Sequence, residues 1–69
     1  SRKKEVVHPR QVAMYILREQ YDISYPSIGD KFGGRDHTTV MHSVEKVKND
    51  LLTDKKLQED IDELKAICV

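Results

Sequence analysis

Residues 35–39, which read Arg-Asp-His-Thr-Thr, combine the side-chain types that can contact the edges of base pairs in duplex DNA. An aspartate can accept a hydrogen bond from the amino group of cytosine, and a threonine methyl group can pack on the methyl group of thymine. Asp36 is also a strong N-cap for a helix that starts after it, and the N-terminal residues of a recognition helix face the bases. The pattern therefore makes Asp36, His37, Thr38 and Thr39 candidates for DNA contacts.

The same residues also have ordinary structural explanations. Asp36 can serve as a helix cap without any ligand, and threonines are tolerated in a first helical turn. A metal site is disfavoured because His37 and His42 are five residues apart and no Cys or further His lies nearby. An Asp-His pair could act in general base catalysis, but the sequence offers no evident nucleophile or pocket. We therefore expect a binding module that is not an enzyme and holds no metal.

Apolar residues recur at helical spacing through the chain of 69 residues, which predicts one small all-α domain, a bundle of about four helices. The predicted segments are a basic arm at 1–8 and helices at 9–20, 24–33, 36–52 and 54–67. Pro9, Ser24 and Asp36 mark helix starts. Gly33 and Gly34 end the second helix, since glycine adopts a left-handed conformation at little cost.

The apolar faces of these helices predict a thin, mainly aliphatic core, because the chain has no Trp and one Phe. The expected core residues are Val12, Ala13, Ile16 and Leu17 in the first helix, Ile28 and Phe32 in the second, Val40, Val44, Val47 and Leu51 in the third, and Leu57, Ile61, Leu64 and Ala66 or Cys68 in the last. A short second helix, a glycine turn and a longer third helix form a helix-turn-helix signature. Similar three-helix units also occur in folds that never bind DNA.

The net charge is zero, but the charges are unevenly distributed. Residues 1–35 carry seven Lys or Arg and four Asp or Glu, a surplus of three positive charges, whereas residues 36–69 carry five and eight, a deficit of three. Such a dipolar domain can turn its basic end to an anion. Arg10 suits a phosphate clamp or a solvated surface position. Arg2, Lys3 and Lys4 form either a flexible tail or an arm for the minor groove.

No stretch has the length and apolarity of a membrane span, and no signal-peptide pattern is present. The single cysteine, Cys68, cannot form an internal disulfide, which fits a reducing cytosol. We expect a cytoplasmic, nucleoid-associated location.

Two strings resemble the DnaA family of bacterial replication initiators: GGRDHTTVMH at residues 33–42 and HPRQVAM at residues 8–14. The resemblance runs from about Arg2 to Asp50. It implies a Trp-repressor-like helix-turn-helix domain that binds double-stranded DNA at the DnaA box, a short A·T-rich site in the replication origin. It also implies further helical sequence before the basic loop, so we expect this chain to be a fragment.

The resemblance also assigns roles to individual residues. It implies base contacts by Asp36, His37, Thr38, Tyr25, Pro26 and Arg2, the last in the minor groove. It implies contacts to the phosphate backbone by Arg10, Gln11, Arg18, Arg35, Thr39 and Lys46. We expect no cofactor here, because the chain has no P-loop and ATP belongs to an ATPase domain of the parent protein. We expect a monomer on a single site.

Two other functions are compatible with the sequence. A related helix-turn-helix could belong to a transcription regulator or a transposase accessory domain. Alternatively, the acidic last helix could bind a protein partner through Glu59, Asp60, Asp62 and Glu63, although such a face is commonly just solvated.

Overall fold

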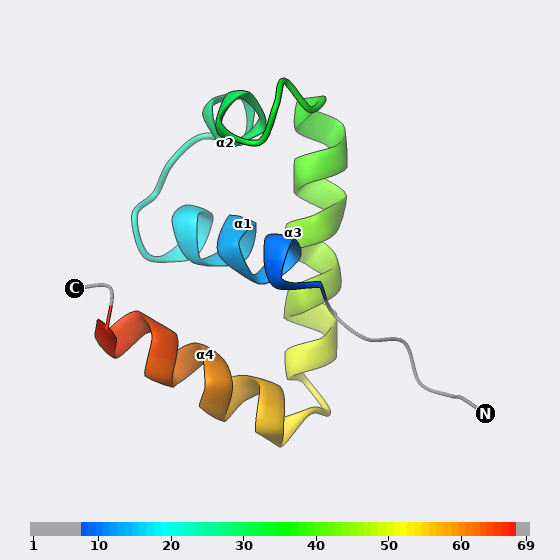
Figure 1. The fold of residues 1–69 in the computed structure, drawn as a ribbon. Coiled ribbons are helices and arrows are strands. Elements are labelled where there is room, and N and C mark those ends of the chain that lie inside the picture. Colours follow the sequence, from blue (N-terminus) through cyan, green and yellow to red (C-terminus); the bar gives the residue numbers. More distant parts are fainter. Residues whose placement is uncertain (1–7, 68–69) are drawn as a thin grey trace.

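The computed structural model describes residues 8–67, which form four helices and, within this range, no strand. The helices are α1 (Pro9–Glu19), α2 (Tyr25–Lys31), α3 (His37–Leu51) and α4 (Lys55–Ile67). α3 is the longest; α1 crosses it near its middle, α2 lies beside its N-terminal end, and α4 lies toward its C-terminal end (Figure 1). The predicted all-α helical bundle is confirmed.

Three side-chain caps begin the later helices. Ser24 Oγ accepts from the Ser27 N–H at 3.3 Å, and Asp36 Oδ1 accepts from the Thr38 N–H at 3.4 Å. These two caps confirm the expectation from the sequence. Asp54 caps the last helix, because its Oδ1 accepts from the Leu57 N–H at 3.0 Å.

The turn between α2 and α3 is built on two glycines and one carbonyl group. Gly33 and Gly34 have φ values of +85° and +76°, the left-handed conformation expected of them. The Gly29 carbonyl accepts from the backbone N–H groups of Phe32, Gly34 and Arg35 at 3.1, 3.0 and 3.0 Å. This arrangement ends α2 at Lys31, two residues before the predicted end, and turns the chain directly into α3.

Gly29 also allows the turn to pack directly on α2. A Cβ atom at this position would meet the carbonyl oxygen of Arg35 at a separation that real Cβ atoms do not show. Gly29 itself is buried. The backbone of the turn therefore occupies the space that any other side chain would need.

The core consists of two clusters that meet along α3. The first holds Met14, Ile28, Val40 and Val44, which join α1, α2 and α3. The second joins α1, α3 and α4 through Ile16, Val47 and Ile61. The apolar stripe predicted for the third helix is thus confirmed for its three valines, while Leu51 is half-buried at the edge of the second cluster.

The predicted apolar face of α1 was partly wrong. Met14 lies outside that face, yet only 1 % of it is exposed, whereas Val12 and Leu17 are half-buried. Met14 and Ile16 are about 200° apart around a helix of 3.6 residues per turn. Because α2 and α3 cover one side of α1 and α4 covers another, both residues are buried.

The predicted faces of the second and last helices are buried only in part. Ile28 is fully buried, but Phe32 is half-buried and lies at the C-cap of α2. Leu64 stays 41 % exposed along an open apolar groove between α1 and α4. Ala66 is exposed, and Cys68 lies outside the described residues.

We expect Gly29→Ala to lower the free energy of unfolding by about 1–3 kcal/mol, the usual cost of overpacking a filled site. For a domain of this size, each kcal/mol lowers the melting temperature by about 4–8 °C. Gly34→Asn is the comparison variant: its Cβ would meet nothing within 4 Å, so any loss of stability reports the cost of a side chain at a φ of +76° and not a steric contact. Thermal denaturation followed by circular dichroism measures both variants. Equal melting temperatures for Gly29→Ala and the unsubstituted domain would contradict the steric role of Gly29.

Candidate nucleic-acid interface

The start of α3 stands at the end of the molecule that is farthest from α4 (Figure 1). In this segment Arg35, Asp36, His37 and Thr39 are exposed, and Thr38 is half-buried. The packing of the α2–α3 turn on Gly29 holds the segment in place. The structure therefore brings five of the predicted site residues together on one exposed helical turn.

Asp36 forms the predicted helix cap and also remains exposed to solvent. Its Oδ1 caps α3 by accepting from the Thr38 N–H at 3.4 Å and lies 3.3 Å from Nδ1 of His37. Its side chain nevertheless remains 66 % exposed, and that of His37 remains 59 % exposed. Because a carboxylate has two oxygens with about four acceptor positions, capping leaves Asp36 able to accept from a ligand.

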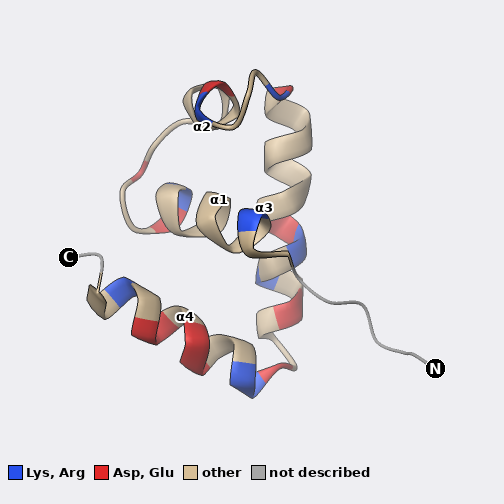
Figure 2. Ribbon diagram, viewed as in Figure 1, with Lys and Arg blue, Asp and Glu red and all other residues tan. Residues whose placement is uncertain are grey.

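The outward face of α3 includes His42, which the sequence brought up only as a disfavoured metal ligand. His42 is exposed and lies one helical turn after Thr38, on the side opposite the buried Val40 and Val44. Its spacing of four residues from Thr38 was the signal that could have identified it. Figure 2 shows that the first half of α3 carries no Lys, Arg, Asp or Glu; the first such residue is Glu45.

Lys46 follows His42 by one further turn and is engaged within α3. Its Nζ lies 3.2 Å from Oδ2 of Asp50, and its side chain is 27 % exposed. An ammonium group has three N–H donors, so this ion pair is compatible with an additional phosphate contact. Lys46 therefore extends the outward face of α3 with a positive charge that is already oriented by Asp50.

The two candidates in α2 differ in how they are held. Pro26 is exposed in the first turn, directly after Tyr25. The Tyr25 side chain is half-buried against the first core cluster, and the guanidinium carbon of Arg18 lies 4.9 Å from its ring centroid. Pro26 thus offers an exposed apolar surface, and Tyr25 anchors it to the core.

The candidates at the start of α1 lie on its first turn. Arg10 is exposed. Gln11 is half-buried, and its Oε1 accepts from the His8 N–H at 3.2 Å, which leaves the side-chain NH2 group as its donor. α1 packs across α3, so this turn and α3 belong to one packed unit.

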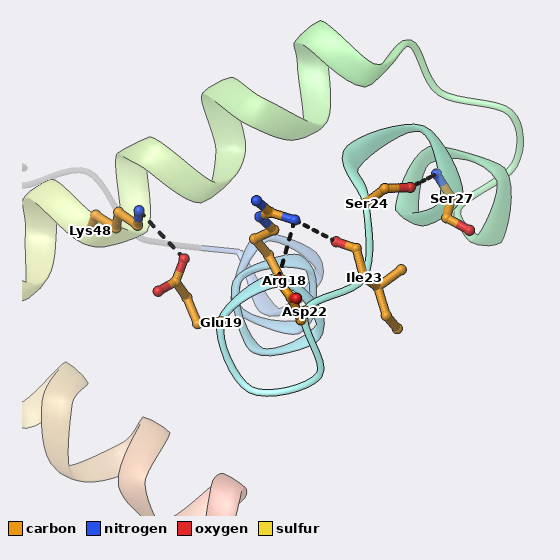
Figure 3. A network of polar contacts seen from close by, with 7 residues as sticks. All are labelled: Arg18, Glu19, Asp22, Ile23, Ser24, Ser27 and Lys48. Carbon is orange, nitrogen blue, oxygen red and sulfur yellow. Dashed lines mark hydrogen bonds and ion pairs between the residues drawn. The ribbon is translucent and has the colours of Figure 1, made fainter.

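Arg18, in the last turn of α1, makes its contacts inside the domain. Its Nη1 donates to the Ile23 carbonyl oxygen at 3.3 Å and lies 3.7 Å from Oδ1 of Asp22 (Figure 3). Its side chain is 34 % exposed. The remaining candidate, Arg2, lies outside the described residues.

Two further features of residues 8–67 bear on function. Within this range no three His, Cys, Asp or Glu side chains are grouped so that they could hold a metal ion. None of the described helices is both long and apolar enough to cross a membrane.

Comparison with known proteins identifies one family. The family described as "Bacterial dnaA protein helix-turn-helix" matches residues 1–47. The chain is 56 % identical over 65 residues to the chromosomal replication initiator protein DnaA of Levilactobacillus brevis, which covers 94 % of this chain. It is 54 % identical over 66 residues to the protein of the same name from Limosilactobacillus reuteri, covering 96 % of this chain. The chain spans only 14 % and 15 % of these two relatives.

We expect Asp36→Ala to lower the free energy of unfolding by about 1 kcal/mol, because the variant loses the oxygen that caps α3. Asp36→Ser should unfold close to the unsubstituted domain, since serine supplies a capping oxygen of its own. Urea denaturation followed by circular dichroism measures the difference without any ligand. If both variants unfolded at the same urea concentration, the capping role of Asp36 would be refuted.

Proposed function

This chain belongs to the bacterial DnaA helix-turn-helix family, and on that premise we propose that it binds double-stranded DNA sequence-specifically. The proposed target is the DnaA box of a replication origin, and the chain is the recognition module of a replication initiator. The observation that carries the proposal is the exposed turn at Asp36–Thr39, held at the start of α3 by the packed turn after α2. A helix-turn-helix of this kind acts by binding, without chemistry of its own.

The first two turns of α3 are suited to the major groove in both shape and charge. Residues 37–44 carry no carboxylate that would repel the phosphates flanking the groove. The backbone N–H groups at the start of a helix favour anions. The acidic helix α4 lies at the other end of the molecule, away from the proposed contact surface (Figure 2).

Sequence specificity is proposed to come from the start of α3 with help from α2. Asp36, His37 and Thr38 contact base edges in the major groove, and Pro26 packs on the groove from the first turn of α2, with Tyr25 behind it. The Arg2 arm is proposed to enter the minor groove.

Affinity is proposed to come from contacts to the DNA backbone around this centre. These contacts are made by Arg10, Gln11, Arg35, Thr39 and Lys46, together with His42, which lies between Thr38 and Lys46 on the outward face of α3. Backbone contacts fix the orientation of a protein on the duplex and carry no sequence information. Arg18 is considered separately below, because its contacts within the domain differ from those of an exposed arginine.

The chain spans about one seventh of the length of its relatives. The activities of the whole protein are therefore proposed separately from those of this domain. We propose that one copy of this domain occupies one site. ATP binding and assembly on the origin are proposed to belong to the other parts of the parent protein, which would act in the cytoplasm at the nucleoid.

We expect His37→Ala and Thr38→Ala to weaken binding to a DnaA-box duplex by about 1–3 kcal/mol, the usual value of a base contact. Binding to a scrambled duplex should not change, because non-specific affinity comes from the phosphates. Fluorescence anisotropy with both labelled duplexes at moderate salt measures the two affinities. An equal loss of affinity on both duplexes would remove the base-reading role from the substituted residue.

We expect Arg10→Ala to weaken binding to both duplexes alike, since a phosphate contact is the same for every sequence. The slope of log K against log salt concentration should fall by about 0.9, the value of one lost phosphate contact. Lys55→Ala is the matched control, because it removes the same charge from an exposed position on α4. A salt slope that falls equally in both variants would show a general effect of charge and contradict a contact by Arg10.

A further inference from the structure

We propose that Arg18 is a positioning residue: its guanidinium fixes the loop between α1 and α2 and thereby places the first turn of α2 for DNA recognition. The positioning role is argued from contacts within the free domain. Its effect on DNA recognition rests on the proposed function. It assigns Arg18 a role different from the phosphate contact that family resemblance implies.

The guanidinium binds the loop at the peptide group that leads into α2. Nη1 of Arg18 donates to the Ile23 carbonyl oxygen at 3.3 Å (Figure 3). Ile23 directly precedes Ser24, whose Oγ caps α2. The Ile23 N–H donates to the Leu17 carbonyl oxygen at 3.2 Å, so both polar groups of Ile23 are tied to the end of α1. The position of Ser24, the N-cap of α2, is therefore fixed through the hydrogen bonds of the preceding residue, Ile23.

The same guanidinium also holds the first residue of α2. Its carbon lies 4.9 Å from the ring centroid of Tyr25, within the range of a cation–π contact. A planar guanidinium can stack on a ring while an N–H at its edge reaches a carbonyl group, whereas the compact ammonium of lysine lacks this geometry. The arrangement therefore depends on arginine and not on positive charge alone.

The ion pair with Asp22 adds little to this clamp. Its N–O distance is 3.7 Å, and the Asp22 side chain is 93 % exposed, so solvent screens the attraction. Asp22 instead contributes through its backbone, because its φ of +55° lies in the left-handed region that reverses the chain. An Asn at this position would keep that conformation, since Asn shares the tolerance of Asp for it.

The end of α1 that carries Arg18 is itself fixed against α3. Glu19 Oε2 lies 3.4 Å from Nζ of Lys48, and this contact raises the pKa of the Lys48 ammonium through the hydrogen bond and the charge of Glu19 (Figure 3). Adjacent residues of α1 thus face α3 and the loop before α2. Through Arg18, the position of Pro26 relative to α3 becomes coupled to the packing of α1.

The test compares Arg18→Lys, which keeps the charge, with Arg18→Met, which keeps the apolar stem. If Arg18 positions α2, both variants lose preference for the DnaA box over the scrambled duplex by on the order of tenfold, comparable to one mismatched base pair. Their salt slopes stay at the value of the unsubstituted domain, because no phosphate contact is lost. Asp22→Asn, the matched control, keeps the preference. Binding is measured below the melting temperature of every variant.

Base-pair substitutions in the DNA separate positioning from general destabilisation. Replacing the base pair contacted by α2 should lower the affinity of Arg18→Lys only slightly. Replacing a base pair contacted by α3 should lower the affinity of Arg18→Lys as much as it lowers that of the unsubstituted domain. If every base-pair substitution lowered the affinity of Arg18→Lys less than that of the unsubstituted domain, and by a similar factor, the proposal would be overturned. A phosphate contact by Arg18 would give a different result: Arg18→Lys would retain the preference for the DnaA box, and the salt slope of Arg18→Met would fall by about 0.9. This result would also overturn the proposal.

Amide hydrogen exchange tests the clamp without DNA. The Ser27 N–H and the Ile28 N–H both donate to Ser24, to Oγ and to the carbonyl oxygen respectively. These two amides should exchange faster in Arg18→Lys, while the amide of Val44 keeps its rate; unchanged rates at Ser27 and Ile28 would overturn the proposal. Equal binding of both duplexes by the unsubstituted domain would instead refute the proposed function, and hydrogen exchange would still decide the role of Arg18.

Discussion

The close approach of the turn to α2 at Gly29 is the constraint on which the proposed DNA-contact surface depends. The Gly29 carbonyl accepts hydrogen bonds from three backbone N–H groups of the turn. The carbonyl oxygen of Arg35 occupies the space that a side chain at position 29 would need. With the backbone so close, a connection of only five residues, 32–36, joins α2 to α3. The first turn of α3 is thereby fixed relative to α2 and exposed at the end of the molecule. A side chain at position 29 would push these two helices apart.

α3 connects this surface to the rest of the fold, because it contributes to both core clusters. Val40 and Val44 pack with α1 and α2 near the exposed turn, and Val47 packs with α1 and α4 one turn later. Only one face of α3 is needed for both clusters, so its opposite face stays available along the helix. Four carboxylates, those of Glu59, Asp60, Asp62 and Glu63, lie on α4, beyond the second cluster. The fold thus keeps these four carboxylates away from the surface that we propose for DNA, in which Asp36 is the carboxylate at the start of α3.

Features that depend on local sequence could be predicted, and features that depend on which elements meet could not. Ser24, Asp36 and the Gly33-Gly34 pair were predicted because caps and left-handed turns are decided within a few residues. The burial of Met14 was missed because it depends on α1 being covered from two sides. The contacts of Arg18 were missed for a related reason. Helical periodicity does not say how the loop after α1 returns across its last turn.

The candidate site shows why a structural explanation and a functional one need not exclude each other. About four N–H groups at the start of a helix lack partners within the helix. Asp36 accepts from one of them, the Thr38 N–H, and this bond fixes the direction of the first turn. Thr38 and His37 leave the backbone in defined directions because the cap is formed, and their side chains reach solvent because the turn is exposed. The capping bond therefore orients this turn for the base contacts that we propose. Its presence does not count against the DNA-binding role.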